Sequence, residues 1–115
     1  MKAYKIDSEN KSVIEIELDE KDSLTGMQAA VGGYIEVALN LDNHDTVFVN
    51  EEGLFGEPSM FFTIEGGHQP FAGNGLVVGT DIKEGTTIAA QSSLAEIKAK
   101  VKFLTIAEVQ DLYDM

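Results

Sequence analysis

Alternating apolar and polar side chains at the start of the chain predict a β-hairpin. We expect strands over residues 1–6 and 13–18 and a turn over residues 7–10, which are of turn-forming types. Successive side chains of a strand point to opposite faces, so the second strand has an aliphatic face and an acidic face that carries Glu15 and Glu17. The aliphatic face consists of Ile14, Ile16 and Leu18.

Helical spacing replaces this alternation in the next segment, where an apolar stripe predicts a short helix over residues 23–31. The stripe consists of Leu24, Met27 and Val31. Asp22 or Ser23 is suited to cap the first turn. We expect Gly32 or Gly33 to end the helix with a positive φ, because glycine adopts the left-handed conformation without a steric penalty.

The middle of the chain predicts a second hairpin, followed by a long irregular excursion. Residues 34–39 and 46–50 have the pattern of strands joined by the polar turn 42–45. Residues 53–75 contain six glycines, both prolines and four phenylalanines, and such a composition is typical of loops and turns. Within this excursion we expect one strand over residues 59–64.

The segment near residue 97 fits two patterns. Its apolar residues alternate with lysines as in a half-buried strand, but they also fit a helical stripe that begins with a capping-box sequence at Ser93 and Glu96. We favour one helical turn near residues 93–97 that runs into a strand over 98–104. A second capping box follows, and it predicts a last helix with one apolar face. The capping box consists of Thr105 and Glu108, and the apolar face consists of Ile106, Val109 and Tyr113.

With two further strands expected over residues 76–80 and 87–91, the elements predict a single domain over residues 1–115. Its class is α+β, with a mostly antiparallel sheet of five or six strands, a helix near residues 23–31 and a C-terminal helix.

The charge of the chain narrows the classes of partner. The 115 residues include 20 acidic residues, eight lysines, no arginine and no cysteine, and the net charge is −12 at pH 7. So negative a chain repels nucleic acid and anionic membranes, and without arginine it has no bidentate clamp for phosphate. Without cysteine it forms no disulfide. No signal or membrane-spanning segment is visible, so we expect a soluble cytosolic protein that contacts neither nucleic acid nor membrane directly.

Candidate catalytic and metal-binding motifs are weak. His44 and His68 lack the spacing of a metal-binding motif, and the chain has no nucleophile elbow. Gly73-Asn74-Gly75 precedes an expected strand rather than a helix, unlike a dinucleotide-binding loop. We therefore expect no catalytic residue, no metal site and no cofactor.

The acidic residues are unevenly distributed. Residues 22–82 contain nine acidic residues and no lysine. This stretch is either a solvated face that keeps the protein soluble or an acidic surface that competes for a basic groove on another protein. Glu15 and Glu17 stand two positions apart on one strand face, about 7 Å from each other, which is close to the phosphate spacing along a nucleic-acid strand.

Two neighbouring aromatic residues, Phe61 and Phe62, stand in the strand expected within the excursion. Adjacent strand residues point to opposite faces, so we expect one ring in the core and the other accessible. The accessible ring either packs locally under the excursion or anchors a partner protein.

Three motifs occur between residues 22 and 82. They are Met27-Gln28-Ala29-Ala30-Val31-Gly32-Gly33-Tyr34-Ile35-Glu36, Val49-Asn50-Glu51-Glu52-Gly53 and Gly75-Leu76-Val77-Val78-Gly79. Together they resemble a small family found in phages, plasmids and bacteria, a domain of unknown function. The chain departs from that family at residues 57–63, where the family pattern is L-P-x-N-x-x-A-T. The resemblance implies an accessory gene of a mobile element, a setting in which small acidic proteins often disarm host defence or host transcription.

The first two motifs also have a physical interpretation. Tyr34, Glu36, Asn50 and Glu51 lie near the ends of the expected middle hairpin and are placed to converge. They form either a structural junction or a binding site.

The leading hypothesis is a non-enzymatic, acidic inhibitor of phage or mobile-element origin. It would act in the host cytosol and bind a basic nucleic-acid channel of a host defence protein, as an anti-CRISPR protein does. Its candidate partner-binding residues are Glu15, Glu17, Glu36, Glu51, Glu52, Phe61 and Phe62. The alternative is a small-ligand binder such as a sponge for a signalling nucleotide, although the lack of arginine disfavours an anionic ligand.

Overall fold

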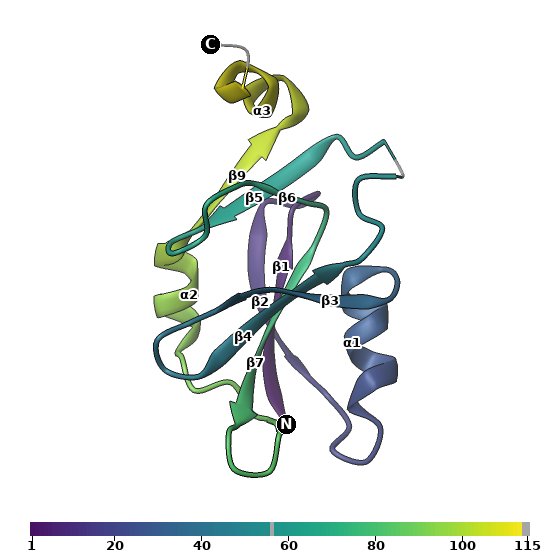
Figure 1. Cartoon of the computed structure of the whole chain (residues 1–115), viewed down its shortest axis with the longest axis vertical. Helices are drawn as coiled ribbons and strands as arrows, with labels where there is room; N and C mark the ends of the chain where they lie inside the picture. Colours follow the sequence, from purple (N-terminus) through teal and green to yellow (C-terminus); the bar gives the residue numbers. More distant parts are fainter. Residues whose placement is uncertain (56, 114–115) are drawn as a thin grey trace.

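The computed structural model describes residues 1–55 and 57–113 and arranges them in two antiparallel sheets with three helices (Figure 1). The larger sheet has six strands in the order β2-β1-β7-β4-β3, with β8 paired to β7. Its strands are β1 (Lys2–Asp7), β2 (Ser12–Glu17), β3 (Ile35–Asn40), β4 (Asp45–Asn50), β7 (Gly75–Asp81) and β8 (Thr86–Ile88). The predicted α+β class, with its mostly antiparallel sheet, first helix and C-terminal helix, is confirmed.

A second, smaller sheet is an addition that the sequence pattern did not predict. Its order is β6-β5-β9, formed by β5 (Met60–Ile64), β6 (Phe71–Ala72) and β9 (Val101–Thr105). The strand expected in the excursion is β5, and it pairs with β9 from Met60↔Thr105 to Ile64↔Val101. The glycine-rich excursion is therefore held in place by the C-terminal part of the chain.

The first helix, α1 (Ser23–Val31), forms where it was predicted. The Thr25 N–H donates to the Asp22 carboxylate at 3.4 Å, which makes Asp22 the cap, and Gly32 adopts the expected left-handed conformation with φ +83°. The predicted apolar stripe is wrong at Leu24, which is 51 % exposed. The face that the sheet covers consists of Met27, Ala30 and Val31.

The helix–strand boundary near residue 97 also differs from the prediction. Helix α2 (Leu94–Lys100) continues for three residues beyond 97, and β9 begins only at Val101. The capping box of Ser93 and Glu96 is fully formed, and Lys98 and Lys100 lie in the last turn, where positive charge favours a helix. The last helix, α3 (Ile106–Tyr113), follows β9 directly. In the part of the chain that the structure describes, no helix is long and apolar enough to cross a membrane.

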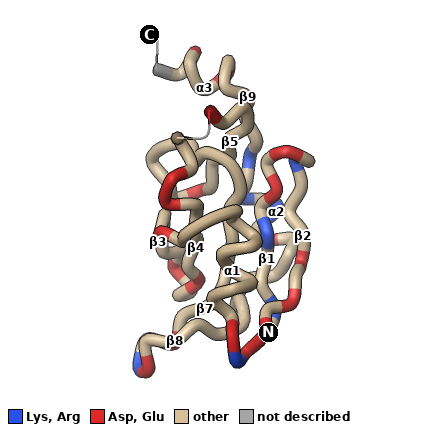
Figure 2. Tube along the Cα trace, turned by 90° about the vertical axis from the view of Figure 1, so that its right-hand side faces the viewer, with Lys and Arg blue, Asp and Glu red and all other residues tan. Residues whose placement is uncertain are grey.

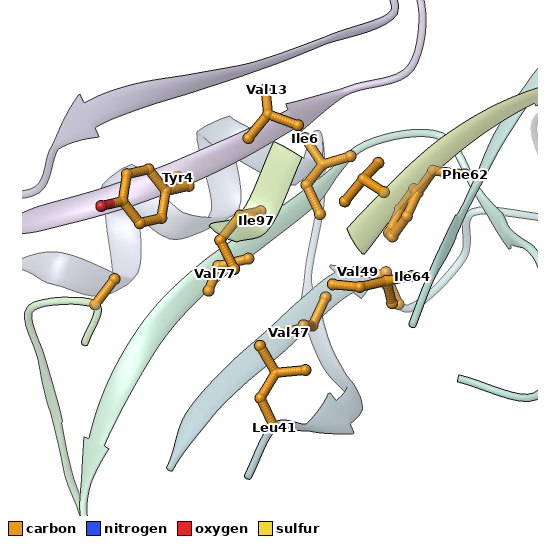
Figure 3. Close-up of a cluster of buried hydrophobic side chains, with 12 residues drawn as sticks. Tyr4, Ile6, Val13, Leu41, Val47, Val49, Phe62, Ile64, Val77 and Ile97 are labelled. Atoms are coloured by element: carbon orange, nitrogen blue, oxygen red, sulfur yellow. The ribbon is translucent and has the colours of Figure 1, made fainter. Parts of the chain in front are cut away.

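Both faces of the larger sheet are covered by hydrophobic side chains. On one face, Ala3, Leu76 and Val78 pack with the buried residues of α1. On the other face, side chains from β1, β2, β4 and β7 meet α2 and the smaller sheet (Figure 3). That second cluster is labelled in Figure 3 as Tyr4, Ile6, Val13, Leu41, Val47, Val49, Phe62, Ile64, Val77 and Ile97.

The prediction that one of Phe61 and Phe62 is accessible is wrong. Their side chains do point to opposite faces of the smaller sheet, but both faces are covered. Phe62 is 0 % exposed and lies in the central cluster, whereas Phe61 is 4 % exposed and packs with Ala72 and with Val109 of α3. Neither ring is available as an exposed anchor, and the local-packing alternative describes this segment.

Asp45, at the start of β4, is a buried carboxylate that organises a distant loop. It accepts hydrogen bonds from the backbone N–H groups of Gln91 and Ser92, both at 2.8 Å, and is 0 % exposed. These bonds draw the segment after β8 toward β4. The strand expected over residues 87–91 is therefore only the three-residue β8.

Candidate functional site

Two of the sequence motifs meet at the end of the β3–β4 hairpin. The Asn50 side-chain amide donates to the Gly32 carbonyl at 3.2 Å, and its Oδ1 accepts from the Glu52 N–H at 2.8 Å. The Glu51 N–H donates to the Tyr34 carbonyl at 2.8 Å. The structure therefore brings the two motifs together, as their positions in the expected hairpin indicated.

The glycines of these motifs serve the junction itself. A Cβ on Gly33 would lie 2.8 Å from the Asn50 Nδ2, and a Cβ on Gly53 would lie 3.2 Å from the carbonyl oxygens of Asn50 and Ala72. The first approach would force the Asn50 side chain to shift, and the second is tighter than most Cβ contacts. Gly33, Gly53 and Asn50 thus serve the junction, and Asn50 also lines the pocket described next.

A half-open pocket of about 440 Å³ lies beside this junction. It is bounded by β3, by the segment after β4 and by β6. Its lining is mostly apolar, with two acidic side chains, Glu36 and Glu51, and no lysine. The apolar lining includes Val37, Val49, Leu54, Phe55, Pro70 and Phe71. A pocket of this composition favours an apolar group attached to a cation over an anionic ligand.

Large apolar side chains are exposed around the pocket. Phe55 is 84 % exposed, Leu54 is 72 % exposed and Val37 is 52 % exposed, and all three line the same cavity. Tyr34, at the entrance to β3, is exposed as well. Because neighbouring exposed apolar residues mark interaction surfaces, we refer to Tyr34, Glu36, Val37, Glu51, Glu52, Leu54 and Phe55 as the β3 surface.

Sequence reasoning missed Leu54 and Phe55. The available signal was a pair of large apolar residues directly after the Asn50-Glu51-Glu52-Gly53 turn, in a glycine- and proline-rich segment. Such residues lie outside regular structure, so neither strand nor helix periodicity assigns them to the core. What the pattern did not reveal is that the segment lies next to β6 and so encloses a pocket.

The charges of the molecule separate into two regions (Figure 2). The β3–β4 side carries acidic segments only, whereas the lysines lie on β1, α2 and β9 and in the segments that follow β1, β2 and β7. Glu36, Glu51 and Glu52 are all exposed. Within residues 1–55 and 57–113, no lysine approaches any of the three within ion-pair distance, since the single ion pair there involves the N-terminus.

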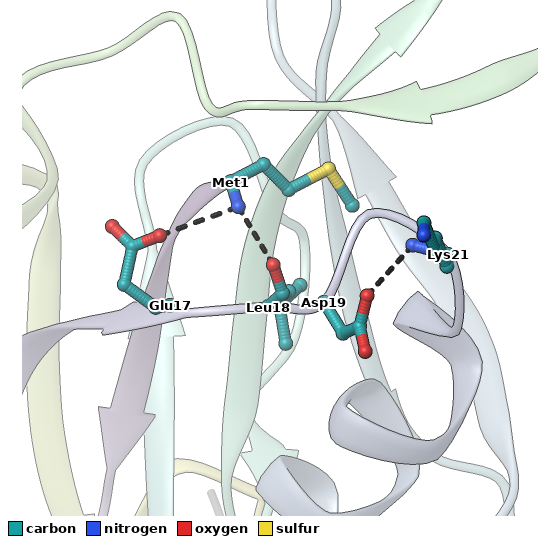
Figure 4. A network of polar contacts seen from close by, with 5 residues as sticks. All are labelled: Met1, Glu17, Leu18, Asp19 and Lys21. Atoms are coloured by element: carbon teal, nitrogen blue, oxygen red, sulfur yellow. Dashed lines mark hydrogen bonds and ion pairs between the residues drawn. The ribbon is translucent and has the colours of Figure 1, made fainter.

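Glu15 and Glu17 lie on β2, at the opposite edge of the sheet from the β3 surface. The Met1 amino group is 3.3 Å from a Glu17 carboxylate oxygen and donates to the Leu18 carbonyl at 2.6 Å (Figure 4). Glu17 thus already has a cationic partner. The seven predicted binding residues therefore lie in three separate places. Glu15 and Glu17 lie on β2, Phe61 and Phe62 lie in the core, and the other three lie on the β3 surface: Glu36, Glu51 and Glu52.

Asp7, Glu96 and Glu108 have carboxyl pKa values below the ordinary range. The Asn10 side chain donates to Asp7 and lowers the pKa of that carboxyl. The backbone N–H and then the hydroxyl of Ser93 lower the pKa of Glu96, and Thr105 does the same for Glu108. These shifts report turns and helix caps rather than a catalytic site.

The two histidines lie apart from the β3 surface. His44 is in the turn between β3 and β4 with φ +69°, and His68 lines a separate small hollow with Pro70 and Leu112. Among the side chains that the structure describes, no three potential metal ligands come together.

Comparison with known proteins places the chain in a family by sequence. A family model described as a domain of unknown function, DUF3846, matches residues 1–103. No curated protein and no solved structure matches the chain. The match includes the larger sheet, α1, α2 and the residues of the β3 surface.

Proposed function

Because the chain belongs to the DUF3846 family, whose description assigns no activity, we propose a function from the surface of the molecule. The protein is a non-enzymatic, acidic inhibitor that occupies a basic, nucleic-acid-binding channel of another protein. The resemblance of its motifs to proteins of phages and plasmids supports a host defence protein as the target, and action in the host cytosol.

The observation that carries this proposal is the lysine-free β3 surface. Its three glutamates are exposed and have no lysine within ion-pair distance in the described part of the chain, so their carboxylates are available to lysine and arginine side chains of a partner. Such charge-assisted hydrogen bonds contribute about 1.5–3 kcal/mol each. The net charge of −12 adds long-range attraction, which speeds association with a basic partner.

The two acidic edges of the sheet supply a matched test. In the Glu36→Gln/Glu51→Gln variant we expect binding to a purified basic partner to weaken by about tenfold or more. The matched Glu15→Gln/Glu17→Gln variant should bind nearly as the unmodified protein does. Affinity should also fall steeply between about 0.05 M and about 0.5 M salt, because exposed charges are screened.

The same partner provides a direct test of inhibition. Its bound RNA or DNA should be displaced as the protein is added, since the two occupy one channel. If both ligands bind simultaneously, or if neither charge variant nor salt changes the affinity, acidic competition is not the function.

The pocket favours a second candidate, a small-ligand binder. Its acidic rim and the absence of lysine from its lining disfavour a signalling nucleotide, and they favour a cation with an apolar body. Thermal-shift measurements with an aromatic amine and with a nucleotide distinguish these classes. A shift with the amine that Phe55→Ala removes supports this candidate, and no shift with either ligand rejects it.

A further inference from the structure

The outer edge of β3 has no neighbouring strand in residues 1–55 and 57–113. Among these residues β3 stands last in the strand order of the larger sheet and pairs only with β4. Its residues Glu36 and Val37 are exposed. A strand at the end of a sheet presents unpaired backbone groups, which form a template for a further strand.

The direction of the backbone groups along β3 follows from one hydrogen bond. The Glu51 N–H donates to the Tyr34 carbonyl, so Tyr34 directs its backbone toward β4. In an antiparallel ladder this direction alternates along the strand. Ile35 and Val37 therefore direct their N–H and C=O groups outward. Within residues 1–55 and 57–113, no backbone hydrogen bond outside the regular helices and strands involves Ile35 or Val37.

A β-bulge limits the length of this open edge. The register of β3 against β4 shifts between Val37 and Leu39, and a bulge interrupts regular pairing and twists the strand. The regular part of the edge thus runs from Ile35 to Val37. This length suits a short extended segment better than a long strand.

The pocket lies on the side of this edge that is away from α1. Glu36 stands opposite Val49 in the register and lines the pocket with it, whereas Ile35 packs with the α1 cluster. Side chains alternate between the two faces of a strand. Every second side chain of an added strand would consequently project toward the pocket and its exposed Leu54 and Phe55.

The negative charge of the β3 surface indicates which kind of segment would pair with this edge. Glu36 lies on β3, and Glu51 and Glu52 follow β4 at the same end of the hairpin. No lysine lies within ion-pair distance of them in the described residues, so basic side chains on the added strand would gain attraction. A second copy of this chain would place Glu36 beside Glu36 if the two β3 edges paired, and like charges placed opposite each other destabilise a ladder.

We propose that the outer edge of β3 binds an extended segment of a partner protein that carries lysine or arginine and apolar residues, and that this segment becomes a further strand of the larger sheet. The inference rests on the proposed function, because the partner is basic in both. Main-chain hydrogen bonds to Ile35 and Val37 provide the affinity, and the pocket and the glutamates select the side chains.

A synthetic peptide tests the main-chain component directly. The probe is a blocked peptide of about eight residues in which lysine and valine alternate. The control peptide has the same side chains and charge, but its central amides are N-methylated and cannot donate to a strand. We expect the first peptide to bind and the second to bind at least about tenfold more weakly. Hydrogen exchange at Ile35 and Val37 should slow when the first peptide is bound.

The protein offers a matched pair of edge variants. Val37→Pro removes an outward N–H from β3, and a proline at such a position is compatible with an edge strand. In β2, the bond from the Met1 amino group to the Leu18 carbonyl implies by the same alternation that Glu15 directs its N–H outward, so Glu15→Pro is the control on the opposite edge. Peptide affinity should fall about tenfold or more in the first variant and stay unchanged in the second.

The outcomes separate this inference from the proposed function. If both peptides bind equally and exchange at Ile35 and Val37 does not slow, strand addition is wrong, while salt-dependent binding still supports the acidic inhibitor. If neither peptide binds and no basic partner binds either, both proposals fail. If sedimentation shows a concentration-dependent dimer that Val37→Pro abolishes, the edge binds a second copy of this chain, and the proposal of a basic partner segment is wrong. Should Val37→Pro fail to fold, the methylated peptide and the exchange measurement decide the question.

Discussion

The two outer edges of the larger sheet carry glutamates in different surroundings. β2 pairs with β1 at six consecutive positions, from Lys2↔Glu17 to Asp7↔Ser12. Glu17 stands opposite Lys2 and contacts the Met1 amino group, whereas Glu15 stands opposite Tyr4. β3 has a bulge, no nearby lysine and an adjoining pocket. Glu17 thus has a cationic partner within the molecule, whereas Glu36, Glu51 and Glu52 have no ion-pair partner in the described residues and lie beside a pocket.

The edges also differ in how their apolar residues are used. On β2, Val13 is buried in the central cluster, and α2 packs close to the strand. Beside β3, Val37, Leu54 and Phe55 remain exposed. Both edges also contribute to the core, β3 through Ile35 and Leu39, and β2 also exposes Ile14. The difference is that the exposed apolar residues beside β3 line a common pocket.

The largest expected effect tests whether the two edges share one core. Phe62 lies in the cluster that contains Val13 from β2 and Val49 from β4. Replacing it by alanine should cost about 3–5 kcal/mol of unfolding free energy, and hydrogen exchange should accelerate in β2 and β3 alike. The control Phe55→Ala removes a ring that is 84 % exposed and should change stability by less than about 0.5 kcal/mol. Exchange that accelerates along only one edge would mean that the two halves are independently stable.

The second largest loss of stability is expected at one of two aspartates, Asp45 of the β3–β4 hairpin and Asp7 of the β1–β2 hairpin. Asp45→Ala leaves the N–H groups of Gln91 and Ser92 without their acceptor, and the Ser92 N–H is buried. We expect a loss of about 2–4 kcal/mol in urea unfolding. Asp7→Ala, at the end of β1, removes bonds to the β1–β2 turn that are exposed to water and should cost less than about 1 kcal/mol. Equal losses would contradict the assignment of Asp45 as the buried tie between the β3–β4 hairpin and the segment before α2.

A smaller effect concerns the junction beneath the β3 surface. Gly32 has φ +83°, and its carbonyl accepts from Asn50. Gly32→Ala should lower the melting temperature through a loss of about 1 kcal/mol. Gly32→Asn should lose less, because asparagine tolerates the left-handed conformation better than alanine. If both variants melt like the unmodified protein, the backbone strain assigned to this position is absent.

The smallest effect is a pH dependence on the β1–β2 side. The Asn10 side chain holds the pKa of Asp7 below its ordinary value of 3.8, so the folded state favours the ionised form. The resulting stabilisation is present above the unfolded pKa and is lost as the pH falls through the folded pKa. Acid titration followed by the amide signals of the turn should detect the loss, and Asp7→Asn should remove it. An unchanged titration in that variant would assign the loss to another group.

Local sequence was sufficient for elements whose geometry depends on near neighbours. The capping boxes at Ser93 and Thr105, the left-handed Gly32 and the two hairpins all depend on residues only a few positions apart. Leu24 shows the limit of a local pattern. It has the spacing of a buried stripe but stays exposed, because the sheet contacts only one side of α1.

At the candidate site, too, the local sequence pattern predicted some features and missed others. The pattern identified Glu36 and Glu51 and expected them to converge, and it placed Glu15 and Glu17 among the same candidates. That β2 and β3 are opposite edges depends on the strand order, and no periodicity contains that information. Nor did the pattern indicate that Leu54 and Phe55 would border a pocket with Phe71.

The sequence by itself determined the charge, the hairpins, the helix caps and the α+β class, since these depend on composition and on short-range spacing. Only the tertiary structure decided which side chains are accessible. Phe61 and Phe62 are both buried because β5 pairs with β9, more than forty residues away in the chain, so that each face of the small sheet meets a different cluster. Burial is a property of what packs against a face, and that partner comes from distant parts of the chain.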